Sequence, residues 1–107
     1  MSDVLIVLVT APAGDAAERL AETLVGERLA ACVNLLGPMR SIYRWQDQIC
    51  RDDEQLLIIK TTRARFAALE ARVRALHPYD VPEIIALSIE LGSAAYLEWI
   101  RSVTGDQ

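Results

Sequence analysis

The stretch DVLIVLVT, residues 3–10, decides the fold, because it places six consecutive aliphatic residues between polar ends. An apolar run without alternating polar residues is typical of a strand that is buried on both faces. A second run of this kind, LLII at residues 56–59, lies inside the extended segment ICRDDEQLLIIKTT (49–62). The sequence therefore predicts a sheet in which two strands need cover on both sides.

Three helices are predicted around these strands. Asp15, with Glu18 three residues later, resembles a capping box at the start of a helix that runs to about Leu29. Apolar residues at helical spacing predict a second helix over residues 63–77. A short third helix is expected after Gly92-Ser93.

Residues 31–46 and 49–62 predict a long hairpin, with arms of about 40 Å at about 3.3 Å per residue. Gly37-Pro38 interrupts the first arm, so this strand should lie at an edge or contain a bulge. Asp47 is expected to adopt a left-handed conformation in the turn. A fourth strand is predicted over residues 82–91. One face of that strand should present Ile85, Leu87, Ile89 and Leu91.

This order of elements predicts an α+β fold, a ferredoxin-like βαββαβ sandwich with a long hairpin between the second and third strands and an extra C-terminal helix, in a single domain over residues 1–107. Helices cover only one face of such a sheet. Four large aliphatic side chains left in water would forfeit about 6–12 kcal/mol, comparable to a whole domain's stability of about 5–15 kcal/mol. We therefore expect identical subunits to cover the open face, with the hairpin reaching a neighbour.

Composition excludes several classes of partner. The chain has 107 residues, 52% hydrophobic and 24% charged, with a net charge of −4 and scattered arginines, which argues against nucleic acid as the main ligand. The longest early apolar run is far shorter than the about 20 residues of a membrane span, and it follows the acidic Asp3 rather than a basic signal region. The expected location is the cytoplasm, with Cys32 and Cys50 as reduced thiols; whether Cys50 is redox-active stays open.

No motif of a known catalytic class occurs in the sequence, and GxSxG, P-loop, GxGxxG and HExxH are all absent. A nucleophile pair of Cys32 or Cys50 with His77 is possible in principle, although Cys32 fits a buried packing position better. One histidine and two separated cysteines are few ligands for a metal site within one chain. The loop TAPAG also lacks the CxxC of ferredoxin-like metal chaperones.

The chain's only histidine lies in ALHPYDVPEII, residues 75–85. His77 falls in the last turn of the second helix, and Pro78 favours an extended backbone at His77 itself. We favour a structural role for this corner. The alternative is a ligand-facing site, because His77, Tyr79 and Glu83 bring three polar tips together.

Two further groups are candidates for binding. Ser41, Tyr43 and Trp45 in SIYRWQ share one side of a strand. We favour a role for the aromatic rings in packing against another subunit. The alternative is stacking on nucleic-acid bases, which the acidic composition of the chain disfavours. Glu54 and Lys60 project from the same sheet face but lie about 20 Å apart. They either reach solvent at the strand ends or line a pocket across a subunit boundary.

The chain resembles the divalent-cation tolerance (CutA) family over nearly its whole length. Six segments occur in the family's order and spacing: LVTAP, ERLAACVN, SIYRWQ, DEQLLIIKTT, HPYDVPEII and AYLEWI. The resemblance implies a ferredoxin-like subunit, a tight homotrimer built through sheets and hairpins, a cytoplasmic location and a link to copper (Cu2+) and other divalent cations. It also implies an architecture similar to that of the PII regulatory trimers.

The resemblance also bears on individual residues. The copper ligands ascribed to some members of the family are a Cys before TAP and two His before PY. Val9 and Leu76 occupy two of these positions here, and His77 is the remaining metal candidate. The candidates for an intersubunit cleft are Cys32, Tyr43, Trp45, Glu54, Lys60, Tyr79 and Glu83. We therefore expect a non-enzymatic, trimeric cation-tolerance protein with a weak metal site at His77. The alternative is a PII-like trimer that binds a small metabolite or anion in its cleft; acylphosphatase-like chemistry lacks its anion-binding loop.

Overall fold

A computed structural model describes residues 3–105. Its elements follow the predicted order of a ferredoxin-like sandwich with an added helix. The strands and helices are β1 (Val4–Pro12), α1 (Asp15–Gly26), β2 (Cys32–Trp45), β3 (Gln48–Thr62), α2 (Arg63–Leu76), β4 (Ile84–Ser88) and α3 (Ala94–Val103). The four strands form one antiparallel sheet in the order β2-β3-β1-β4. The predicted fold class is confirmed.

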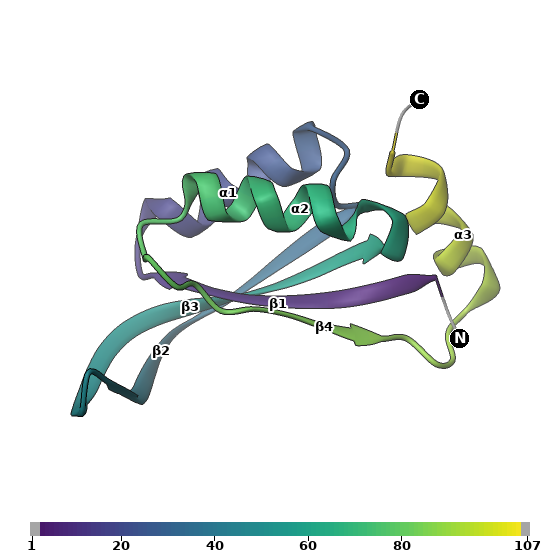
Figure 1. Cartoon of the computed structure of the whole chain (residues 1–107). Helices are drawn as coiled ribbons and strands as arrows, with labels where there is room; N and C mark the ends of the chain where they lie inside the picture. The colour runs from purple at the N-terminus through teal and green to yellow at the C-terminus, as the bar shows by residue number, and fades with distance from the viewer. Residues whose placement is uncertain (1–2, 106–107) are drawn as a thin grey trace.

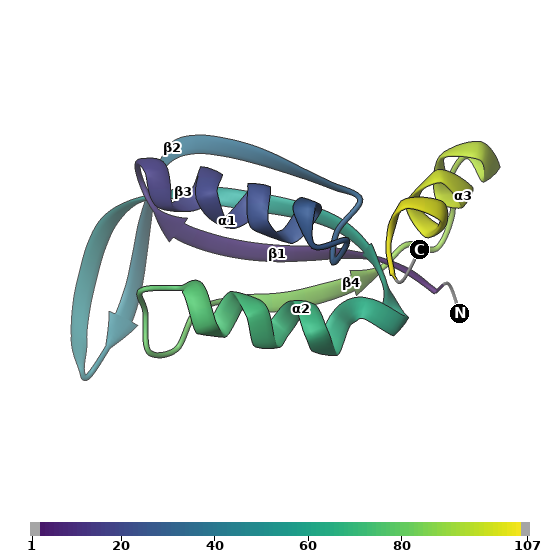
Figure 2. The same cartoon turned by 90° about the horizontal axis from the view of Figure 1, so that it is seen from above.

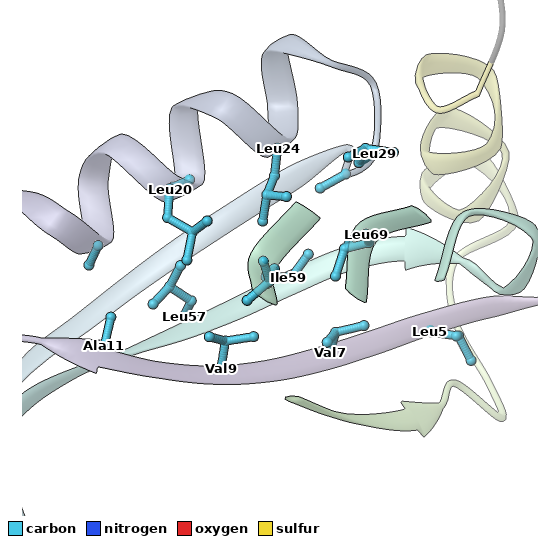
Figure 3. Close-up of a cluster of buried hydrophobic side chains, with 14 residues drawn as sticks. Leu5, Val7, Val9, Ala11, Leu20, Leu24, Leu29, Leu57, Ile59 and Leu69 are labelled. Atoms are coloured by element: carbon cyan, nitrogen blue, oxygen red, sulfur yellow. The ribbon is translucent and has the colours of Figure 1, made fainter. Parts of the chain in front are cut away.

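Helices α1 and α2 lie side by side on one face of the sheet (Figures 1 and 2). The core fills the space between them and the central strands. Figure 3 shows Leu20 and Leu24 of α1 directed toward Leu57 and Ile59 of β3, with Val9 of β1 beside them. All five side chains are buried, as are Leu69 and Val73 of α2, so both helices pack onto this face.

The opposite face of the sheet is largely bare. Strand pairing aligns its side chains in rows across the sheet. One row is Asn34, Ile58, Leu8 and Ile85, and the next is Cys32, Lys60, Ile6 and Leu87. Helix α3 covers only the end of this face, where Ile100 buries Val4 in a small second cluster. We call the aliphatic part of these two rows, Ile6, Leu8, Ile58, Ile85 and Leu87, the open apolar face.

The hairpin has the predicted length and turn. Trp45 pairs with Gln48, and both intervening residues have positive φ, 50° at Gln46 and 63° at Asp47. This is the conformation of a tight two-residue hairpin turn. The register of β2 shifts between Leu36 and Met39, so the predicted irregularity lies at Gly37-Pro38 on an edge strand. Beyond it the hairpin bends away from the body of the molecule (Figure 1), whose extents are 44 × 25 × 22 Å.

The first predicted helix is too long at its C-terminal end. Helix α1 ends at Gly26, because Arg28 is left-handed with φ 61° and the Leu29 and Ala30 N–H groups both bond to the Leu24 carbonyl. The predicted capping box is also wrong. The N-cap is Gly14, which has no side chain, so the acidic residues of the first turn act through the helix dipole.

The fourth strand is shorter than the predicted 82–91. It begins at Ile84, because the next carbonyl along β1, that of Thr10, bonds to the His77 side chain instead. It ends at Ser88, where β1 itself runs out, and a last hydrogen bond joins Ile89 N–H to the Val4 carbonyl. The predicted apolar face of this strand is therefore not continuous. Ile85 and Leu87 belong to the open apolar face, whereas Ile89 packs with the α3 cluster.

Replacing Leu24 with alanine should lower the free energy of unfolding by about 2–5 kcal/mol, because Leu24 is fully buried between α1 and the sheet. Val25→Ala is the matched control on the outer side of the same helix, and its effect should stay within about 0.5 kcal/mol. Urea denaturation at one fixed protein concentration measures both. Equal losses in the two variants would contradict this assignment of the inner helix face.

Candidate functional site

One pocket lies between the outer part of the hairpin and the segment after α2, as its lining residues show. Figure 1 shows this segment descending from α2 toward the sheet. The pocket has a volume of about 570 Å3, within the usual range for small-molecule sites. Its aromatic and acidic lining consists of Tyr43, Trp45, Tyr79, Glu54, Asp80 and Glu83. Thr10, Ser41, Ile42 and Val81 complete it. We call this the hairpin pocket.

Glu54 is the buried polar group of the pocket, with 5% of its surface exposed. Its Oε2 accepts a hydrogen bond of 2.8 Å from the Tyr79 hydroxyl. The irregular part of β2 lies close to the Glu54 backbone. A Cβ at Gly37 would lie 3.2 Å from the Glu54 backbone oxygen, and the φ of Gly37 is 140°. Glycine at this position therefore allows the hairpin to bend next to the buried carboxylate.

Two tyrosine–carboxylate pairs shape the electrostatics of the pocket. The Tyr43 hydroxyl donates to Asp52, and this bond raises the pKa of Tyr43 to about 12. Burial, followed by the bond to Glu54, raises the pKa of Tyr79 as well. Both phenols therefore stay protonated at neutral pH and act as hydrogen-bond donors to carboxylates.

His77 fastens the corner that positions the pocket. Its backbone is extended, as predicted from Pro78, and its ring is buried. Nδ1 accepts a hydrogen bond of 3.1 Å from the Tyr79 N–H, so the ring proton lies on Nε2, which donates to the Thr10 carbonyl at 2.7 Å. The ring also packs on Tyr79, with centroids 4.7 Å apart. These contacts tie the end of α2 to β1 and orient Tyr79 toward Glu54.

The predicted cleft residues divide into two groups. Tyr43, Trp45, Glu54, Tyr79 and Glu83 line the hairpin pocket together. Cys32 and Lys60 lie instead toward the other end of the sheet, where Lys60 bonds to Asn34 and its Nζ is 3.9 Å from Cys32 Sγ. The division follows from the register, since Lys60 pairs with Ile6 near the start of β1 and Glu54 pairs with Pro12 at its end.

Sequence reasoning missed Asp52, Asp80 and Asn34. Asp52 pairs with Ser41 across the hairpin, so the predicted turn at Asp47 already implied that a carboxylate neighbours the SIYRWQ aromatics. Asn34 shares the parity of Lys60's partner Cys32 on β2. For Asp80 the only signal in the sequence is its position between Tyr79 and Glu83, because the path of the loop depends on the His77 contacts.

The residues present do not fit a metal centre at His77. Both ring nitrogens are occupied by backbone groups, so neither has a lone pair available for a metal ion. Within residues 3–105, no three or more His, Cys, Asp and Glu side chains are grouped so as to hold a metal ion. Cys32 and Cys50 are both free, and neither lines the hairpin pocket.

Topology and pocket define an α+β protein of the ferredoxin-like class with an acidic, aromatic pocket between a long hairpin and the segment after α2. Residues 5–103 match the family model described as CutA1 divalent ion tolerance protein, so the chain belongs to the CutA1 family. None of the helices within residues 3–105 is long and apolar enough to cross a membrane.

Individual relatives agree with this assignment. The chain is 52% identical over 100 residues to the divalent-cation tolerance protein CutA of Thermus thermophilus, covering 94% of this chain and 97% of that protein. A solved structure of the Thermus thermophilus divalent cation tolerance protein has a TM-score of 0.93 at 51% identity, covering 95% of this chain and 99% of that one. A rice relative, the chloroplastic protein CutA 1, is 46% identical over 94% of this chain, which spans 56% of the rice protein.

Raising the pH should weaken folding through the two pocket tyrosines. A phenol whose pKa is higher in the folded state contributes stability that is complete below its unfolded pKa of about 10. That contribution is lost as the pH rises from about 10 through the folded-state value, which is about 12 for Tyr43. Urea unfolding on both sides of pH 10 should show a smaller loss in a Tyr43→Phe/Tyr79→Phe double variant. Tyr96→Phe, outside the pocket, is the control and should keep the full loss.

His77→Ala should lower the free energy of unfolding by about 1–3 kcal/mol, because the Thr10 carbonyl and the Tyr79 N–H lose their partner. The exposed neighbour gives the matched control, Leu76→Ala, whose effect should be small. Calorimetric titration with Cu2+ should give the same isotherm for wild type and His77→Ala. A copper isotherm that changes with His77 would contradict the structural role.

Proposed function

We propose that this chain is a non-enzymatic homotrimer of the cytoplasm that serves divalent-cation tolerance. In this proposal the subunits cover one another's open apolar face, each hairpin reaches a neighbour, and the hairpin pocket becomes the ligand site at the boundary between two subunits. The free cysteines suit a reducing compartment.

The open apolar face is the observation that supports the trimer. Ile85 and Leu87 are 52% and 56% exposed, next to Ile6, Leu8 and Ile58 in the same rows. The hairpin adds Ile42 and Ile49, which are 64% and 59% exposed. A contiguous aliphatic surface of this kind is typical of a subunit interface.

The tolerance role is supported by the names of the relatives, which refer to divalent cations. Direct copper coordination at His77 forms no part of the proposal, because that ring holds the corner of the pocket on both nitrogens. The hairpin pocket is the alternative place for a ligand, since it combines a buried carboxylate with three aromatic side chains.

A second candidate function, a PII-like sensor of a small molecule, is favoured by the size of the hairpin pocket. The lining opposes the anionic version of that hypothesis. Three carboxylates border the pocket, and no lysine, arginine or histidine among residues 3–105 lines it. An anion would meet repulsion without a compensating positive group.

Sedimentation of the wild type at micromolar concentration should show a trimer, and Ile85→Lys should shift it toward smaller species. The substitution places a charge in the middle of the open apolar face but disturbs the isolated subunit little, because Ile85 is already half exposed. Val25→Lys, on the outer side of α1, is the matched control and should remain trimeric.

A folded, soluble monomer of the wild type would contradict the proposed assembly. The link to tolerance is tested in a bacterial strain that lacks its own family member, by growth in the presence of CuSO4. Wild type and Val25→Lys should restore growth. Restoration by a dissociated Ile85→Lys would show that the trimer is not needed for tolerance.

A further inference from the structure

We propose that the hairpin pocket binds a small organic cation, a protonated amine or a quaternary ammonium group. This inference rests on the proposed function, in which a neighbouring subunit closes the pocket, and it names the class of ligand for that site. Three features of the pocket support it independently: its charge, its aromatic walls and the incomplete hydrogen bonding of Glu54.

The charge of the lining favours a cation. Glu54, Asp80 and Glu83 border the pocket from β3 and from the loop after α2. Asp52 lies close by on β3, bonded to the Tyr43 hydroxyl. No basic side chain within residues 3–105 lines the pocket, so every charged side chain in its lining is negative. A negative cleft with low-dielectric walls concentrates cations and repels anions.

The aromatic walls favour an organic cation over a metal ion. Tyr43 and Trp45 of the hairpin and Tyr79 of the corner contribute three rings, and such rings attract ammonium groups through their faces. A divalent metal would need several oxygen donors at about 2.0–2.6 Å from one point. Residues 3–105 hold no such group of three acidic, histidine or cysteine ligands, and a volume of about 570 Å3 is far larger than one ion requires.

The hydrogen bonding of Glu54 is the third sign of a ligand. Its side chain is 95% buried, and its only hydrogen bond within residues 3–105 joins Oε2 to the Tyr79 hydroxyl. Within residues 3–105, Arg65 Nε is the one side-chain polar atom that is both fully enclosed and without a hydrogen-bond partner. Glu54 Oε1 also has no partner, so it cannot be fully enclosed. Because Glu54 lines the hairpin pocket, we infer that Oε1 is reached from there. A buried carboxylate with a single neutral donor is incompletely compensated. A ligand cation would supply the missing positive charge.

The test uses the trimer of this 107-residue chain with Trp99→Phe, which leaves Trp45 in the pocket wall as the only tryptophan of the chain. Choline is the probe, and 3,3-dimethylbutan-1-ol is its uncharged control of the same shape. Choline should change the Trp45 fluorescence saturably, and the uncharged control should bind about tenfold more weakly or not at all. Methylammonium should compete with choline, while acetate and MnCl2 should not.

Matched variants locate the charge that matters. Glu54→Gln should weaken choline binding about tenfold, because the carboxylate with the accessible oxygen becomes neutral. Glu90→Gln removes the same charge at an exposed position outside the pocket and should leave binding unchanged. If Glu54→Gln fails to fold, the comparison of choline with its uncharged control still decides the question in the protein that retains Glu54.

Several results would overturn the inference. These are equal binding of choline and its uncharged control, no saturable response to choline in a trimer verified by sedimentation, and displacement by MnCl2 or acetate. In those cases the trimer itself would stand, and the pocket would hold a neighbour's side chain, a metal ion or an anion instead. A wild-type monomer would overturn the proposed function as well, so the two failures are distinguishable.

Discussion

One-sided cover of an apolar sheet is the constraint on which the rest of this structure depends. Helices α1 and α2 bury the residues of one parity on β1 and β3, and the residues of the other parity remain as the open apolar face (Figure 1). Helix α3 relieves this at one end only, through Ile100 on Val4. Burying these aliphatic side chains would contribute a free energy comparable to a domain's net stability, and this is the basis of the proposed association of subunits. In the proposed trimer, a neighbouring subunit closes the hairpin pocket.

The hairpin pocket exists because two irregularities meet at the same end of the sheet. The interruption at Gly37-Pro38 bends the hairpin away from the body, and the His77 corner brings Tyr79 down beside Glu54. Neither irregularity would produce a pocket alone. An uninterrupted β2 would continue flat along β3, and a helix end without the Thr10 contact would leave Tyr79 free to turn to solvent.

His77 illustrates how one residue type supports opposite interpretations until its neighbours are known. A lone histidine in a family linked to divalent cations invites a metal role. Here each ring nitrogen has a backbone partner, so the imidazole acts as a fixed link between α2 and β1. The carboxylates and aromatic rings that it helps to position are the more informative chemistry.

The sequence by itself determined the order of elements, the interruption of the first hairpin strand at Gly37-Pro38, the hairpin turn at Asp47 and the surplus of aliphatic strand surface, because these depend on local periodicity and turn chemistry. It also singled out Tyr43, Trp45, Glu54, Tyr79 and Glu83. Only the tertiary structure decided that these five share a pocket from which Cys32 and Lys60 are absent, and that β4 ends at Ser88. Those outcomes depend on strand register and on long-range hydrogen bonds, such as that from His77 to Thr10, which join residues far apart in the chain and leave no local pattern.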